Sequence, residues 1–83
     1  MVGMFATAKA GHDKDKLYVI MREDEEYVYL VDGRIRTMDR PKKKNKKHIQ
    51  IITKKSPALE QNQWNDLMIK RILKEYQKSK EKS

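Results

Sequence analysis

The sequence predicts a mainly β domain of five short strands, followed by one C-terminal α-helix. Three observations support this fold class. Short runs rich in β-branched and aromatic residues alternate with polar turns through the first 54 residues. The dipeptide Asp32-Gly33 separates two such runs, which is a strong hairpin signal because a type I′ turn needs positive φ. From about Asn62 the apolar residues change to the 3.6-residue period of a helix.

Each expected strand is bounded by turn residues or by charge. The strands are expected near residues 2–9, 16–22, 27–32, 35–39 and 48–53. Glycine and aspartate in the segment 11–15 favour a first turn, and the acidic run 23–26 favours a solvated hairpin tip. In the fourth strand, Ile35 alternates with Arg34 and Arg36, so we expect Ile35 to face the core and both arginines to face outward.

One apolar stripe identifies the C-terminal helix. Trp64, Met68, Ile72 and Tyr76 follow one another at intervals of four residues, and we expect this stripe to pack against the sheet. Asn62 is the candidate N-cap. The chain then divides into a β domain over 1–54, a linker over 55–61, a helix over 62–79 and a frayed tail over 80–83.

Length and composition narrow the class of protein. The chain has 83 residues, enough for one domain, with 37% apolar and 39% charged residues. Without cysteine, neither a disulfide framework nor a thiolate metal site is possible. No signal-peptide pattern opens the chain, and no apolar run approaches the ~20 residues that span a bilayer. We therefore expect a soluble, cytoplasmic protein without a membrane partner.

The positive charge is concentrated in one segment. The net charge is +8, but residues 34–55 hold ten Lys/Arg and one acid, net +9, whereas residues 1–33 are net −3. Within this segment the run from Arg40 to His48 contains six cations and no acid. Such a run cannot be buried, because each charge would lose its hydration. It predicts an exposed loop that meets phosphates, and the alternative is a solvated loop that serves solubility.

The first half of the chain resembles a KOW motif. An alternating strand ends at Lys9, Gly11 stands at the characteristic glycine of the motif, and a β run starts at Leu17. Asp15 departs from the pattern, because many members have a second glycine there. With Asp32-Gly33, the lysine-rich run and the C-terminal helix, the chain is similar to the large-subunit KOW ribosomal proteins of archaea and eukaryotes and to their short bacterial relatives. The resemblance implies a five-stranded SH3-like barrel that binds RNA, usually ribosomal RNA.

The residues and the resemblance together predict a non-catalytic RNA-binding protein, ribosomal-protein-like or ribosome-associated and active in translation. Its expected partners are RNA and, in second place, ribosomal proteins, and no cofactor, metal or small-molecule substrate is expected. Phosphate contacts would supply most of the affinity. The candidate RNA-binding residues are the basic ones of the central segment and of the first turn: Arg34, Arg36, Arg40, Lys42, Lys43, Lys44, Lys46, Lys47, His48, Lys54, Lys55, Lys9, Lys14 and Lys16.

Other readings of single features stay open at this point. Tyr18, Tyr27 and Tyr29 could stack on unpaired bases, although tyrosines at strand spacing also pack in cores. The acidic run 23–26 lacks the spacing of a calcium loop and would repel RNA from its end of the domain. The two histidines lie among lysines without the partners of a catalytic triad. The rival function is a protein-interaction module that uses the barrel or the apolar face of the helix.

Overall fold

The computed structural model describes residues 2–9, 16–55 and 64–81. These residues form five strands, a single turn of 3-10 helix and one α-helix, which confirms the predicted fold class. The elements are β1 (Met4–Ala8), β2 (Leu17–Glu23), β3 (Tyr27–Val31), β4 (Lys42–Asn45), η1 (Lys46–His48), β5 (Ile49–Lys55) and α1 (Asp66–Glu81). The predicted linker lies outside the described residues except for Lys55, which ends β5, and the predicted tail overlaps the last residues of α1.

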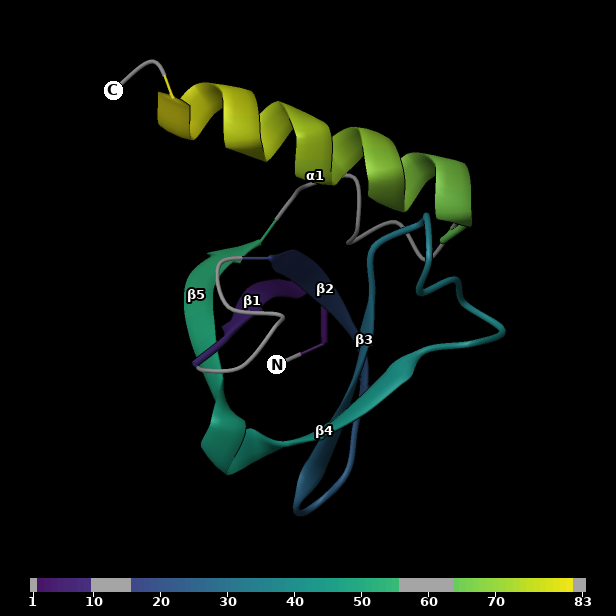
Figure 1. Ribbon diagram of the computed structural model, residues 1–83, viewed down its shortest axis with the longest axis vertical. Helices are drawn as coiled ribbons and strands as arrows, with labels where there is room; N and C mark the ends of the chain where they lie inside the picture. The colour runs from purple at the N-terminus through teal and green to yellow at the C-terminus, as the bar shows by residue number, and fades with distance from the viewer. Residues whose placement is uncertain (1, 10–15, 56–63, 82–83) are drawn as a thin grey trace.

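The five strands form one antiparallel sheet in the order β4-β3-β2-β1-β5. The sheet curls into a half-barrel, and α1 lies outside the curl across the top of the view in Figure 1. This architecture is that of a small SH3-like barrel with a C-terminal helix. The two edge strands, β4 and β5, are joined by the short turn η1.

Alternation along the strands builds a separate core on each face of the sheet. On the inner face, Ile20, Val28 and Leu30 pack with other buried residues of β1, β2 and β5. On the outer face, Val19 and Val31 pack with residues of α1. Neighbouring residues of β2 and β3 therefore belong to different cores, as a pleated strand with side-chain period two requires.

The helix packs on the outer face through its apolar stripe, as predicted. Ile72 is buried and Trp64 is partly buried against the outer core. The centre of the contact is Ile69, which is 0% exposed, whereas Leu67 is 68% exposed. Asn65, not Asn62, caps the helix, because its Oδ1 accepts a hydrogen bond from the Met68 N–H at 2.8 Å. Asn62 itself lies outside the described residues.

A close approach at Gly33 joins the helix to the loop that follows β3. Gly33 has φ +76°, and a Cβ atom added there would overlap the carbonyl oxygen of Asp66 and lie 2.8 Å from the amide nitrogen of Lys70. The Asp66 carboxylate also accepts a hydrogen bond from the Met38 N–H at 2.8 Å. One helical turn thus contacts the same loop at two positions, Gly33 and Met38, and only glycine fits the first contact.

The predicted fourth strand over 35–39 is wrong. This segment is a loop, and Ile35, which was expected in the core, is 75% exposed. The cause is Asp32, whose Oδ1 accepts the N–H groups of Arg34 and Arg36 at 2.8 and 2.9 Å. These bonds to a side chain satisfy the backbone locally, so the chain turns instead of pairing with β3. The partner of β3 is the lysine-rich β4.

Candidate nucleic-acid interface

Most of the basic run, from Lys42 to His48, lies in β4 and η1 and does not form the loop that we expected. In β4, Lys42 and Lys44 lie opposite Leu30 and Val28 of β3. The following turn, η1, is capped by Asn45, whose Oδ1 accepts the N–H of Lys47 at 2.9 Å. The cations of this run are therefore carried by hydrogen-bonded backbone, which limits the conformational entropy lost on binding.

Alternation separates the lysines of β4 onto two faces. Lys42 and Lys44 lie on the inner face and are half-buried, whereas Lys43 is exposed on the outer face. Burial lowers the pKa of Lys42, and the like charge of Lys44 lowers it further. The lysines are therefore not equivalent. The exposed side chains of the basic run, which are the ones best placed for a ligand, are Arg40, Lys43, Lys47 and His48.

The acidic hairpin tip lies beside the basic run and not apart from it. The amide of Lys46 donates a hydrogen bond to the carbonyl oxygen of Glu26 at 2.9 Å, and Lys46 Nζ lies 2.9 Å from a carboxylate oxygen of Glu23. The hydrogen bond from Lys46 is the main cause that lowers the pKa of Glu23. One cation of the basic run is thus partly neutralised within the chain, and the tip limits the interface on this side.

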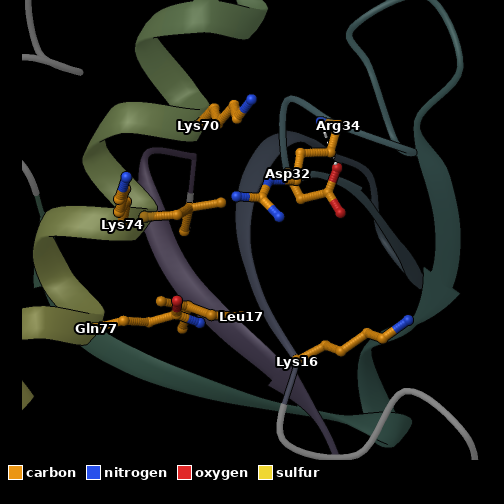
Figure 2. A pocket seen from close by; sticks show the side chains of 8 residues that line it. Lys16, Leu17, Asp32, Arg34, Lys70, Lys74 and Gln77 are labelled. Atoms are coloured by element: carbon orange, nitrogen blue, oxygen red, sulfur yellow. Dashed lines mark hydrogen bonds between the residues drawn. The ribbon is translucent and has the colours of Figure 1, made fainter. Parts of the chain in front are cut away.

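A second group of cations surrounds a hollow between α1 and the loop after β3. The hollow has a volume of about 430 Å³ and is lined by Lys16, Arg34, Lys70 and Lys74 among others. Figure 2 shows the two helical lysines on one side and Asp32 with Arg34 on the other. The side chains of Lys70 and Lys74 share a helix face because they are four residues apart. Four cations and one acid around an open hollow suit a phosphate group.

The remaining predicted cations are only partly brought to these sites. Lys9 is exposed and follows β1, where its N–H donates a hydrogen bond to the carbonyl oxygen of His48 at 3.0 Å. The end of β1 therefore adjoins the basic run. Lys54 and Lys55 lie in β5. Lys14 and the KOW-type glycine Gly11 lie outside the described residues. Arg36 is half-buried in the loop after β3.

The three candidate stacking tyrosines have different environments. Tyr18 is buried in the inner core, where burial is the main cause that raises its pKa, so it cannot stack on a ligand. Tyr27 and Tyr29 are half-buried on the outer face. Lys43 Nζ lies 4.4 Å from the ring centroid of Tyr27, and Arg22 Cζ lies 5.7 Å from that of Tyr29. Such contacts contribute about 0.5–1 kcal/mol at exposed sites.

Three cations of the interface were missed by reasoning from the sequence. Lys70 and Lys74 lie in the predicted helix, and their spacing of four residues places them on one face, but neither was among the candidate RNA-binding residues. Arg22 lies in β2, which agrees with the strand predicted over 16–22, but it was not among the candidate RNA-binding residues. A bulge sets its orientation, and no pattern in the sequence marks that bulge.

The described residues contain no group of three or more His, Cys, Asp or Glu side chains that could hold a metal ion. Within the same part of the chain, α1 is too polar and short to cross a membrane. No family model matches the sequence, and no curated protein matches it.

Proposed function

We propose that this protein is a non-catalytic RNA-binding module that docks structured RNA, with ribosomal RNA as its preferred partner. The observation that carries the proposal is the placement of most of the basic run on β4 and η1, where hydrogen-bonded backbone presents the exposed side chains of Lys43, Lys47 and His48. A polyanion is the partner that such a surface fits, because each phosphate releases counterions on binding. The resemblance of the sequence to KOW domains supports RNA as that polyanion.

The second group of cations extends the proposed interface toward the helix. The loop after β3 starts at the hollow, where Arg34 faces α1, and ends at Pro41 before β4. The same loop therefore connects both cation groups. Two phosphate sites on one rigid fold select the relative positions of phosphates, and this favours folded RNA over a flexible strand.

Salt dependence gives the first measurement of this function. If about five phosphates are neutralised on duplex-like RNA, log K should fall with log salt with a slope near −4 to −5. Fluorescence anisotropy with an RNA hairpin between 50 and 400 mM salt measures this slope, to which each neutralised phosphate contributes about −0.9. Co-sedimentation with ribosomes at low and high salt tests the preferred partner.

Two matched variants separate a defined interface from general charge attraction. Arg40→Gln/Lys47→Gln removes one arginine and one lysine from the exposed part of the basic run. Arg71→Gln/Lys78→Gln removes the same charges from exposed positions of α1. We expect the first variant to lose about tenfold or more in affinity at 50 mM salt and to flatten the slope by about 1.8. The second should stay close to wild type.

Three results would contradict the proposal. Equal losses in both variants would mean that binding follows net charge alone. Wild-type affinity in the Arg40→Gln/Lys47→Gln variant would show that the basic run is not part of the RNA-binding interface. Low salt strengthens phosphate contacts, so RNA binding should be detectable at 50 mM salt. Absence of RNA binding below about 10 μM at that salt concentration, together with capture of a protein partner, would favour a protein-interaction module instead.

Removing the acid that pairs with Lys46 should strengthen RNA binding. Glu23→Gln eliminates the carboxylate 2.9 Å from Lys46 Nζ, so this cation becomes available to a phosphate. We expect affinity to rise several-fold at 50 mM salt and the difference to shrink at high salt. Glu25→Gln is the control, because it removes the same charge from an exposed position of the same tip. An equal gain in both variants would show that only the total charge matters.

A further inference from the structure

The outer face of the sheet carries two tyrosines that belong to neither core. Tyr27 and Tyr29 alternate along β3 with the buried Val28 and Leu30, so both lie on the face that carries Val31 at the end of the strand. The helix packs at the Val31 end of that face. Within the described part of the chain, neither tyrosine packs against either core, and both are only half-buried. Their rings are thus partly open to solvent.

A β-bulge places a cation beside the second of these rings. The pairing of β2 with β3 shifts between Ile20 and Arg22, so that Arg22 and not Met21 lies opposite Tyr29. Without the extra residue, alternation would turn Arg22 to the inner face. On the other side of the same tyrosine lies Lys43 of β4. One row across three strands therefore consists of a cation, an aromatic ring and a second cation.

The spacing of these groups matches successive nucleotides of an unpaired strand. Tyr27 and Tyr29 are two residues apart in β3, so their positions along the strand differ by about 7 Å. Lys43 lies 4.4 Å from the first ring centroid and Arg22 lies 5.7 Å from the second, so each ring has a cation at hand. Single-strand binders combine aromatic rings for the bases with cations for the backbone in this way.

We propose that Tyr27, Tyr29, Arg22 and Lys43 form a tyrosine platform that binds unpaired RNA nucleotides by base stacking. The inference rests on the proposed function and names the part of the RNA that this face recognises, a loop or bulge beside the duplex that the basic run holds. On binding, the two bases take the ring faces, and Lys43 and Arg22 turn to the flanking phosphates. Replacing the cation–π contacts by stacked bases is favourable, because base stacking on an aromatic ring is stronger than an exposed cation–π contact.

Two strands of equal charge test the platform directly. An unstructured RNA of about 12 nucleotides and an abasic strand of the same length carry the same phosphates, but only the first has bases. The wild-type protein should bind the RNA more tightly, by roughly 5- to 150-fold for each stacked base. Tyr27→Leu/Tyr29→Leu should abolish this preference and leave the affinity for the abasic strand unchanged. Tyr27→Phe/Tyr29→Phe retains the rings and should retain the preference.

The outcomes separate this proposal from the proposed function. If the leucine variant keeps the preference for bases, or if wild type binds both strands equally, the platform is overturned while phosphate binding still registers on the abasic strand. If the Arg40→Gln/Lys47→Gln variant binds both strands like wild type, the proposed function fails instead.

A measurement on the wild-type protein covers the case of a leucine variant that does not fold. The ring protons of Tyr27 and Tyr29 should shift in NMR spectra when the base-bearing strand is added, because a stacked base adds its ring current. The abasic strand should leave them in place. Ring signals that do not respond to the base-bearing strand overturn the platform.

Discussion

Replacing Gly33 by alanine should destabilise the protein by about 3–5 kcal/mol, a large part of the stability of so small a domain. Two costs combine at this position. The backbone has φ +76°, which a residue with a Cβ atom adopts only with strain. The new Cβ atom would also overlap the carbonyl oxygen of Asp66 and approach the amide of Lys70, both of them backbone atoms that cannot turn aside. The helix must therefore move away from the loop.

Gly3 provides the matched control for this substitution. It has φ +90°, yet a Cβ atom added there would meet nothing within 4 Å. Gly3→Ala thus has the backbone cost of about 1–2 kcal/mol without the clash. Thermal denaturation should place the midpoint of Gly33→Ala roughly 10–20 °C below that of Gly3→Ala, since 1 kcal/mol shifts the midpoint by about 4–8 °C in a domain of this size. Equal midpoints would show that the close contact between Gly33 and the helix backbone does not contribute to stability.

Shortening Ile69 should cost nearly as much. Ile69→Ala leaves a cavity where a fully buried side chain joins α1 to the outer core, and such truncations cost about 2–5 kcal/mol. Leu67→Ala removes a similar volume from an exposed position on the same helix and should stay within about 0.5 kcal/mol of wild type. Urea denaturation of both variants measures the difference. Similar losses in the two variants would contradict the packing of this helix face on the sheet.

Both substitutions also bear on the interface. Lys70 and Lys74 line the hollow only while α1 lies against the loop that carries Arg34. Gly33→Ala and Ile69→Ala each loosen that contact from a different side. A variant that stays folded at low temperature but lets the helix move should therefore lose part of its RNA affinity, although no cation has been removed.

The sequence predicted the elements whose apolar pattern is local. The first three strands, the last strand and the helix all have alternation or a helical period in their own residues, and the structure confirms them. The predicted stripe packs on the outer core, but its most buried neighbour could not be identified from the sequence, because Met68 and Ile69 both fit a 3.6-residue period. Only contact with Val19 and Val31 decides that Ile69 is central.

The fourth strand could not be predicted from its own residues. The apolar side chains of this strand pair belong to β3, where Val28 and Leu30 fill the inner core. Three consecutive lysines can therefore form β4 by pairing with the backbone of β3, without apolar residues of their own. The segment around Ile35 has the better local pattern but is held in a loop by the carboxylate of Asp32. A strand made by its partner has no signal in its own composition, and tertiary pairing overrides propensity here.

The candidate site was predictable in charge but not in geometry. The concentration of cations between Arg34 and His48 is plain in the sequence, and the structure places their exposed members on a fixed backbone. Three features depend on contacts between elements: Lys46 pairs with Glu23, Lys70 and Arg34 line one hollow, and Arg22 lies beside Tyr29. These contacts follow from the curl of the sheet and from one bulge.

The position of β4 at the end of the sheet has a consequence for the behaviour of the protein at high concentration. No described strand pairs with its far edge, and an open edge invites a second copy to add its own strand. Here pairing of two copies through β4 would bring Lys42, Lys43 and Lys44 of each chain together, and repulsion between these like charges destabilises such a dimer. The same cations thus guard against aggregation. This effect does not depend on any bound partner.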